Sequence, residues 1–176
     1  TQGSGKTTAA GHLATLGCKP FRGIPTGEEL ASNCEAQNWK QSNAIFEMAT
    51  NGSDGSMAVL DRSVWSLVAY NIRKRPEHRS LIYELGKSMF KRRFCDETNC
   101  TLIFLETDPE TSFCREDGHT IHSHRSLEEV SQEAEVYQWL AQNLEQDGFN
   151  VVRIPNNDIS KEEFFGLVEQ TAGFTS

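Results

Sequence analysis

The stretch Gly3-Ser4-Gly5-Lys6-Thr7-Thr8 (GSGKTT) decides how the rest of the chain is interpreted. Gly5, Lys6 and Thr7 fill the last three positions of G-x-x-x-x-G-K-[ST]. In that motif, backbone N–H groups cradle phosphates, the lysine reaches the β- and γ-phosphates, and the hydroxyl holds Mg²⁺. The motif's first glycine would fall one residue before Thr1. The stretch therefore predicts a phosphate-binding loop, and the alternative is a glycine- and serine-rich disordered terminus.

The residues after this loop predict a helix, and the motif itself predicts a strand before it. The segment from Thr8 to Leu16 has a helical pattern, and Gly17 is placed to cap it. A phosphate-binding loop normally follows a buried parallel strand, which here would lie upstream of Thr1. We therefore expect the first strand to be missing from this sequence. Its neighbours would lose ladder partners and apolar cover, so we expect the isolated 176-residue segment to be unstable or inactive.

Length and composition favour one acidic domain. The 176 residues can form one domain with a hydrophobic core, and the net charge of −8 argues against a protein that mainly binds nucleic acid. No apolar run approaches the length of a membrane span, so no membrane partner is expected. Five cysteines at spacings that fit no zinc framework indicate free thiols in a reducing, cytoplasmic compartment. They are Cys18, Cys34, Cys95, Cys100 and Cys114.

Apolar runs alternate with helical patterns, which is typical of an α/β fold with a parallel sheet. Strands are expected over residues 56–61, 101–106 and 149–154, with a weaker candidate over 18–24. In the weaker one, Pro20 argues against a central place in a sheet. Helices whose apolar stripes are mostly core are expected over 28–50, 63–73, 81–92 and 127–144. Pro76 separates the second of these from the third.

Asp61 follows the apolar run Ala58-Val59-Leu60, at the predicted carboxyl end of a strand. Ligands of parallel sheets bind beyond these ends, so Asp61 is the natural partner of the phosphate loop. A carboxylate there can orient Mg²⁺ or its water shell, or take a proton from an attacking oxygen. Arg62 follows, and a guanidinium pairs well with phosphate or carboxylate oxygens. The alternative for Asp61 is a helix N-cap, but the strand and the phosphate loop favour the functional role.

A polar segment between the second strong strand candidate and the last long helix predicts a lid. Phosphoryl transfer needs charge neutralisation and exclusion of water, which a mobile segment bearing arginine supplies. Arg115 and Arg125 bracket such a segment, so we place the lid at about residues 115–126. The alternative is a solvated loop whose arginines pair with nearby carboxylates. The thiol and imidazole groups there match no zinc spacing; they belong to Cys114, His119, His122 and His124.

Four stretches resemble the thymidylate kinase and deoxynucleoside kinase branch of the P-loop kinases. The first is GSGKTT. The second, DRSVWSLVAY (61–70), resembles D-R-Y-x-x-S-x-x-A-Y of thymidylate kinases and E-R-S-[VI]-Y-S of deoxynucleoside kinases. The third, FLETDPETSFCR (104–115), resembles a strand followed by D-P-E and an arginine at the entrance to a lid. The fourth, RIPNNDISKEEFFGLVEQ (153–170), resembles the final strand, adenine loop and last helix of thymidylate kinases.

The resemblance implies a single P-loop kinase domain over residues 1–176, with a three-layer α/β fold. A parallel sheet would carry helices on both faces and a lid. The resemblance also implies ATP and Mg²⁺ as cofactors, and transfer of the γ-phosphate to a nucleoside or nucleoside monophosphate. Nucleic acid and membrane are not among the implied partners. Family members are often dimers, so a homodimer is one of the assemblies that the resemblance allows.

The resemblance also implies a role for each matched residue. The loop from Gly3 to Thr8 would cradle the phosphates, with Lys6 binding them and Thr7 holding Mg²⁺. Asp61 would lie beside the metal or the acceptor, and Arg62 would bind the acceptor side. Arg115 would close over the donor phosphates. Arg125, which brackets the lid on its other side, is a further candidate for cofactor binding on the lid argument alone.

One departure from the family pattern weakens the resemblance to thymidylate kinases and to deoxynucleoside kinases alike. Thymidylate kinases carry Arg-Glu-Pro-Gly near the second strand, where this chain reads Arg22-Gly23-Ile24-Pro25. The acidic residue is missing, although deoxynucleoside kinases use a carboxylate in this region as a base. The acceptor pocket therefore departs from the family pattern more than the phosphate loop does.

Three functions stay open on the sequence. The leading one is a thymidylate kinase-like nucleoside monophosphate kinase, favoured by Asp61 before Arg62, by Ala69-Tyr70 and by the adenine-loop match. The second is a deoxynucleoside kinase, favoured by Ser63 and by LEEV…YQWL (127–140). Convergence of Arg62 with another cation, from Arg22 or Arg73, would support the monophosphate acceptor. The third is a non-catalytic nucleotide-binding module, suggested by the missing acidic residue.

Overall fold

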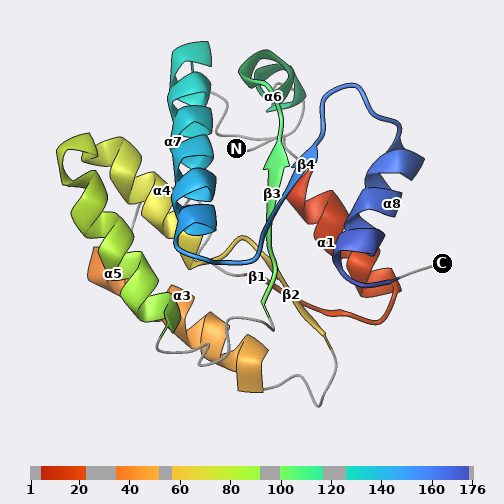
Figure 1. Cartoon of the computed structure of the whole chain (residues 1–176), viewed down its shortest axis with the longest axis horizontal. Helices are drawn as coiled ribbons and strands as arrows, with labels where there is room; N and C mark the ends of the chain where they lie inside the picture. The colour runs from red at the N-terminus through yellow and green to blue at the C-terminus, as the bar shows by residue number, and fades with distance from the viewer. Residues whose placement is uncertain (1–4, 23–34, 52–56, 92–99, 117–125, 175–176) are drawn as a thin grey trace. The chain divides into compact units, whose positions relative to one another are not determined.

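The chain forms two compact units, which are described separately (Figure 1). One comprises residues 7–95, and the other comprises residues 1–6 together with 96–176. The computed structural model describes residues 5–22, 35–51, 57–91, 100–116 and 126–174. Gly3, Ser4, Arg125 and most of the predicted lid therefore lie outside the described residues.

The unit of residues 7–95 pairs two parallel strands and surrounds them with helices. Strand β1 (Lys19–Arg22) pairs with β2 (Ala58–Asp61), with Lys19 opposite Ala58 and Arg22 opposite Asp61. Its helices are α1 (Lys6–Thr15), α3 (Glu35–Asn51), α4 (Val64–Lys74) and α5 (Arg79–Lys91). Helix α1 begins one residue before the unit, and the 3₁₀ turn η1 (Pro76–His78) precedes α5. Both strands end at the same edge because their register is parallel, and this edge carries the site residues described below.

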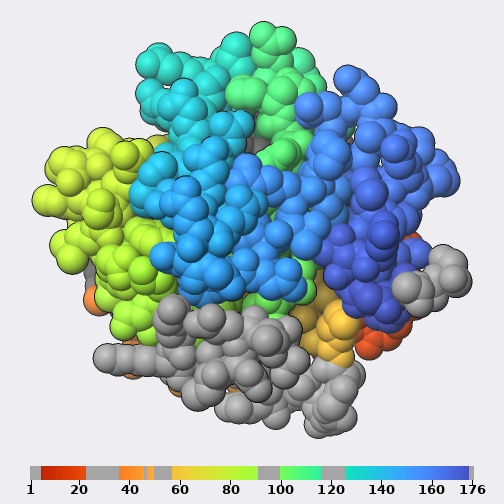
Figure 2. Space-filling view, in the orientation of Figure 1, coloured from red at the N-terminus to blue at the C-terminus, as the bar shows by residue number. Residues whose placement is uncertain are grey.

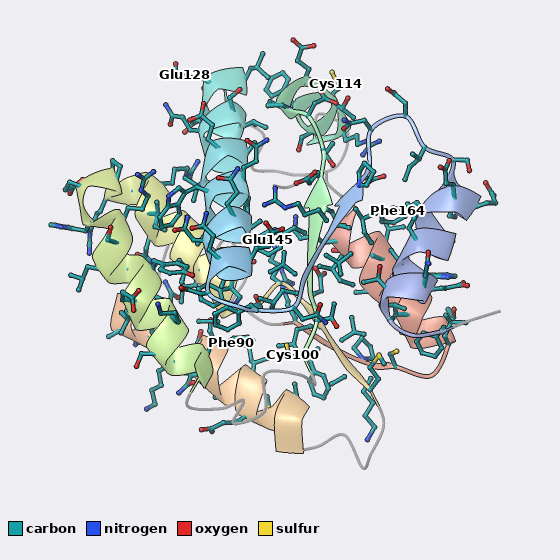
Figure 3. All side chains as sticks on the ribbon, viewed as in Figure 1. Phe90, Cys100, Cys114, Glu128, Glu145 and Phe164 are labelled. Atoms are coloured by element: carbon teal, nitrogen blue, oxygen red, sulfur yellow. The ribbon has the colours of Figure 1, made fainter. Side chains whose placement is uncertain are left out.

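Aromatic packing between α4 and α5 forms much of the core of this unit. Trp65 of α4 is buried and packs against Tyr83 and Phe90 of α5, with ring centroids 5.8 and 5.6 Å apart. Phe90 is labelled on α5 in Figure 3. Gly86 of α5 packs closely against α4, because an added Cβ would lie 2.4 Å from Cγ2 of the fully buried Val68. Gly86 is therefore required by packing.

We expect Gly86→Ala to destabilise the protein by about 1–3 kcal/mol, because the added methyl group overpacks the contact with Val68. The matched control is Gly166→Ala in α8 (Lys161–Thr171), where nothing lies within 4 Å of the added Cβ. That change should stabilise by roughly 0.5–1 kcal/mol through helix propensity. Urea and thermal unfolding measure both values. Equal stabilisation by the two variants would contradict the close α4–α5 contact.

The second unit also contains a parallel strand pair. Strand β3 (Leu102–Glu106) pairs with β4 (Val151–Pro155), with Leu102 opposite Val151 and Glu106 opposite Pro155. Its helices are α6 (Pro109–Glu116), α7 (Leu127–Gln146) and α8. Figure 1 shows β3 (green) and β4 (blue) side by side, and both α7 and α8 contact β4. The core of this unit draws on Val130, Leu140, Leu144, Ile154, Phe164 and Val168.

An ion-pair cluster fastens α7 to the strands of this unit. The guanidinium of Arg153 on β4 donates from Nε and Nη2 to the two carboxylate oxygens of Glu145, at 2.7 and 3.0 Å. Its Nη1 donates to Glu106 of β3 at 3.2 Å. Glu145 is labelled at the end of α7 in Figure 3. The hydrogen bonds that Arg153 donates to these carboxylates, with Glu145 the larger contributor, raise the pKa of Arg153.

Helix ends follow the predicted capping chemistry. Gly17 has a φ of +96°, its N–H donates to Ala14, and the N–H of Cys18 donates to Leu13. This pair of bonds is a Schellman motif, so the predicted cap is confirmed. Ser126 begins α7 with a capping box, because its hydroxyl accepts from the N–H of Glu129 while that carboxylate accepts from the N–H of Ser126.

Some sequence predictions for the core are wrong. Leu81 is 71 % exposed and Leu85 and Met48 are also exposed, although all three were expected in apolar core stripes. On α5 the buried face runs through Ile82, Tyr83 and Phe90 instead, because Tyr83 packs on Trp65. Figure 2 shows α5 (yellow-green) contributing to the molecular surface. Among the described residues, no helix combines the length and apolarity that crossing a bilayer requires.

Candidate functional site

The carboxyl end of β2 brings together two residues that the sequence predicted as metal ligands. Asp61 is the last residue of β2, and Thr7 lies in the first turn of α1. The Thr7 hydroxyl Oγ1 donates to Asp61 Oδ2 at 2.7 Å, across 54 positions of sequence. The phosphate-loop hydroxyl and the strand-end carboxylate are therefore direct neighbours.

The second oxygen of Asp61 tests whether this pair fits Mg²⁺. Asp61 Oδ1 is buried and has no hydrogen-bond partner within the part of the chain that the structure describes. A buried carboxylate oxygen without a partner is costly unless a water or an ion satisfies it. Carboxylate and hydroxyl oxygens are the hard ligands that Mg²⁺ prefers, usually with several waters retained. Thr7 and Asp61 therefore fit a magnesium ion held with its water shell.

Arg62 takes an unusual backbone conformation directly after this carboxylate. Its φ is +71°, the left-handed region that side chains other than glycine rarely adopt. Such a residue costs about 1–2 kcal/mol and is often found at functional sites. The helix N-cap is Ser63, whose hydroxyl accepts from the N–H of Trp65 at 3.3 Å. Asp61 is therefore not the N-cap that the sequence left as its alternative role.

Replacing Arg62 with glycine is expected to raise the stability of the protein and to lower its activity. Glycine accepts positive φ without strain, so Arg62→Gly should raise stability by about 1 kcal/mol. The family resemblance implies that Arg62 binds the acceptor, so loss of the guanidinium should lower kcat/KM for that substrate by about 10–100-fold. Arg62→Ala is the control, because it removes the charge but keeps the strain. Thermal unfolding and initial rates measure the effects; unchanged activity in both variants would remove Arg62 from the site.

Arg22 is a second cation at this edge. It ends β1 and is in register with Asp61, so the two residues are cross-strand neighbours. Arg22 is exposed, and Arg62 directly follows Asp61 in the sequence, so two arginines are neighbours of Asp61 along the backbone and across the strand pair. Arg73, the other cation proposed from the sequence, lies in the last turn of α4. That turn is roughly 14 Å along the helix from its start, so Arg73 does not join this cluster.

In the second unit, the loop after β4 contacts the phosphate loop. Gly5 has a φ of +87°, and a Cβ on it would lie 2.8 Å from Asn156 Nδ2. Asn156 is buried, and its N–H donates to the carbonyl of Glu106 at 2.8 Å, which extends the strand ladder by one residue. Only a glycine at position 5 leaves room for this approach.

Arg115 ties the same loop to α6. Its Nη1 donates to the carbonyl of Asn156 at 2.9 Å, and its Nη2 donates to the carbonyl of Asn157 at 3.0 Å. The N–H of Asp108 donates to the side-chain oxygen of Asn157 at 2.8 Å. The carboxylate of Asp108 accepts from the N–H of Thr111, and this bond is the main cause of its lowered pKa. Sequence analysis missed these contacts and missed α6, whose start was signalled by Asp108-Pro109-Glu110.

The remaining predicted residues are placed as follows. Lys6 is the first residue of α1, and Thr8 lies in its first turn. Residues 115 and 116 of the predicted lid belong to α6 and residue 126 caps α7, whereas 117–125 lie outside the described residues. The described residues hold no group of three or more metal-ligating side chains, and the lid histidines are not among those described.

The described cysteines are free thiols, as expected from their spacing. Cys18, Cys100 and Cys114 form no disulfide. Burial raises the pKa of Cys100 to about 11 and that of Cys18 in the same direction. Cys114 is exposed on α6, where Figure 3 labels it.

Comparison with known proteins identifies the fold. No protein-family model and no curated protein matches the chain. Among solved structures, deoxyadenosine kinase from M. mycoides with bound dATP matches with a TM-score of 0.65 and 12 % identity, covering 98 % of this chain and 96 % of that one. The same kinase with bound dCTP matches at 0.64 and 14 %, covering 99 % and 96 %. With the products dCMP and dCDP it matches at 0.64 and 12 %, with the same coverage. The chain therefore has the α/β fold of these P-loop deoxynucleoside kinases, which confirms the predicted fold class.

Proposed function

We propose that this protein is an ATP-dependent kinase that transfers the γ-phosphate to the 5′-hydroxyl of a deoxynucleoside. The observation that carries the proposal is the 2.7 Å bond from the phosphate-loop hydroxyl of Thr7 to Asp61 at the end of β2. It occurs in a chain whose fold matches deoxyadenosine kinases over nearly its whole length. This choice favours the second of the functions that the sequence left open.

The phosphate loop supplies the donor side of the proposed reaction. Backbone N–H groups from Gly3 to Thr8 and the ammonium group of Lys6 bind the phosphates of ATP. Thr7 and Asp61 hold Mg²⁺, which neutralises the charge that develops on the phosphate oxygens. Arg115 and Arg125 are assigned to the donor side as well.

Asp61 and its neighbours supply the acceptor side. Thr7 donates to Asp61 Oδ2, so the unpartnered Oδ1 is the atom assigned to accept the proton of the acceptor hydroxyl. At the ends of β1 and β2, Asp61 is the carboxylate and Arg22 is its cross-strand neighbour. Arg62 orients the acceptor by hydrogen bonds from its guanidinium. The acidic residue of the family pattern is missing after Arg22, so we propose Asp61 as the group that accepts the proton of the acceptor hydroxyl.

A nucleoside monophosphate is the second candidate acceptor, as in thymidylate kinases. The specific observation in its favour is the pair of cations that flank Asp61, Arg22 from β1 and Arg62 after β2. Two arginines next to Asp61, one in register on β1 and one directly after it in the sequence, would offer guanidinium donors to a further anion, such as an acceptor phosphate. This alternative keeps the same fold, donor and metal, and it differs in the acceptor alone.

Product identification distinguishes the candidates. The full-length protein is incubated with ATP, Mg²⁺ and single deoxynucleosides or their 5′-monophosphates, and the products are separated by ion-exchange chromatography. Monophosphate products from deoxynucleosides support the proposal. Diphosphate products formed from monophosphates alone support the second candidate. ATP binding without turnover of any acceptor would favour a non-catalytic nucleotide-binding module.

A further inference from the structure

We propose that Arg115 is a positioning residue that holds the loop after β4 against the phosphate loop, and that donor-nucleotide affinity depends on this support. The inference rests on the proposed function, because it assigns a role on the donor side of that site. It differs from the direct phosphate contact that the family resemblance implies for Arg115. The loop in question comprises residues 156–160, between β4 and α8.

The geometry of Arg115 is that of a support for this loop. Its two terminal nitrogens donate to successive carbonyl oxygens, those of Asn156 and Asn157, at 2.9 and 3.0 Å. A planar guanidinium presents two parallel donors, so it can bridge two consecutive carbonyls, whereas an ammonium group is a point donor. These bonds use one N–H of each terminal nitrogen, so the two loop carbonyls fix the orientation of the guanidinium. The structure therefore assigns both terminal nitrogens to the loop.

A second tie reaches the same loop from the start of α6. The N–H of Asp108 donates to the side-chain oxygen of Asn157 at 2.8 Å. Asp108 is itself held by the N–H of Thr111, which donates to its carboxylate at 2.8 Å. Both ends of the short helix α6 therefore contact the loop, through Asp108 before its first residue and through Arg115 in its last turn. Such a doubly held loop keeps one conformation before any ligand binds.

The loop in turn supports the phosphate loop. The side chain of Asn156 is buried, and its Nδ2 lies against Gly5, 2.8 Å from the position of an added Cβ. Phe164 of α8 lies on the same side of Gly5, with its Cζ at 3.6 Å from that position. Gly5 is the glycine that directly precedes Lys6 in the motif, so its backbone conformation shapes the phosphate cradle. Loosening the loop should therefore weaken phosphate binding without removing any phosphate ligand.

Four variants of the full-length protein test this chain of contacts: Arg115→Ala, Arg115→Lys, Asn157→Ala and the double variant Arg115→Ala/Asn157→Ala. We expect Arg115→Ala to raise the Kd for ATP by about tenfold or more, and Asn157→Ala by about threefold to fivefold. The acceptor KM should stay within about threefold. Arg115→Lys should restore little, because lysine cannot bridge two carbonyls. The double variant should bind ATP no more than about 1.5-fold more weakly than Arg115→Ala, because both changes release one loop.

Hydrogen exchange of the 155–163 peptide gives a readout that does not depend on catalysis. Without ATP, exchange should be faster in Arg115→Ala and in Asn157→Ala than in the wild type. The control is Cys114→Ala, an exposed neighbour on α6 that should change neither exchange nor affinity. If the protein binds ATP but transfers no phosphate, these measurements still decide the inference while the proposed function fails.

Two results would overturn the inference. In the first, Arg115→Lys binds ATP almost as well as the wild type, and the two alanine changes multiply in the double variant. That outcome would indicate a direct contact between the cation and phosphate. In the second, loop exchange and ATP affinity are unchanged in every variant. That outcome would show that the contacts of Arg115 do not support the donor site.

Discussion

Asp61→Asn is expected to lower kcat by about 10²–10⁴-fold, the range lost with a group that orients or accepts a proton. The amide keeps the shape of the side chain, and its oxygen can still accept the 2.7 Å bond from Thr7. It loses the negative charge, and it replaces a carboxylate oxygen with NH₂, which is a donor and cannot ligate Mg²⁺. Initial rates at saturating ATP, acceptor and Mg²⁺ measure the effect. Thermal unfolding should show a melting temperature close to that of the wild type.

Glu77→Gln is the matched control for Asp61→Asn. It also removes one carboxylate from the unit of residues 7–95, but Glu77 is exposed in η1, and its pair with His78 is a 3.8 Å surface contact. Its rate should equal that of the wild type. If Asp61→Asn retained activity within about tenfold of the wild type, Asp61 would not be the carboxylate that the reaction uses.

Lys6→Ala is expected to lower kcat by about 10²–10³-fold, similar to the loss of one donor that stabilises transition-state charge. Lys6 is the first residue of α1, directly after the glycine with φ of +87°, so it lies where the helix dipole also favours anions. Its ammonium group is the mobile charge proposed to follow the γ-phosphate during transfer. The substitution should also raise the Kd for ATP, which titration calorimetry measures.

Lys74→Ala provides the comparison for Lys6→Ala. Lys74 ends α4, is exposed, and lies 4.4 Å from the ring centroid of Tyr70. Its loss should leave kcat and the Kd for ATP unchanged, at a small cost in stability from the exposed cation–π contact. Equal activity of Lys6→Ala and Lys74→Ala would contradict the assignment of the phosphate loop, whatever the acceptor.

Strands and capped helix ends were the parts of the fold most accessible from the sequence. Apolar runs such as Leu102-Ile103-Phe104-Leu105 set the positions of β2, β3 and β4 to within about two residues, because buried parallel strands read as continuous hydrophobic segments. Gly17 marked the end of α1 because its local conformation needs no tertiary partner. Pro20 lies within β1 although proline is disfavoured in central strands.

Features that depend on long-range contacts were less accessible. The exposure of Leu81 and Leu85 follows from the packing of Tyr83 on Trp65, which periodicity alone does not reveal. The predicted apolar stripe of α5 was therefore wrong at Leu81 and Leu85, whereas Ile82 and Phe90 are buried as expected. Helix α6 was missed because its eight residues are mostly polar, although Asp108 and Pro109 carry a helix-start signal.

In the candidate site too, features set by local sequence were predictable and features set by long-range contacts were not. The phosphate loop and Asp61 were identified from local motifs, and the structure joins Thr7 to Asp61 by a hydrogen bond. The pairing of Arg22 with Asp61 depends on the register of β1 and β2, which the sequence does not specify. The contacts of Arg115 with the Asn156 and Asn157 carbonyls depend on tertiary structure in the same way.

Acceptor-dependent formation of ADP from ATP is the most direct test of the proposal that this protein is a kinase. The full-length protein is assayed with Mg²⁺ and a pool of deoxynucleosides, with the same mixture lacking acceptor as the blank. We expect ADP to form at a rate that rises with acceptor concentration. We also expect Lys6→Ala and Asp61→Asn each to reduce this rate at least about a hundredfold. If the protein binds ATP but its rate of ADP formation does not change when deoxynucleosides or their monophosphates are added, the proposed kinase activity is contradicted.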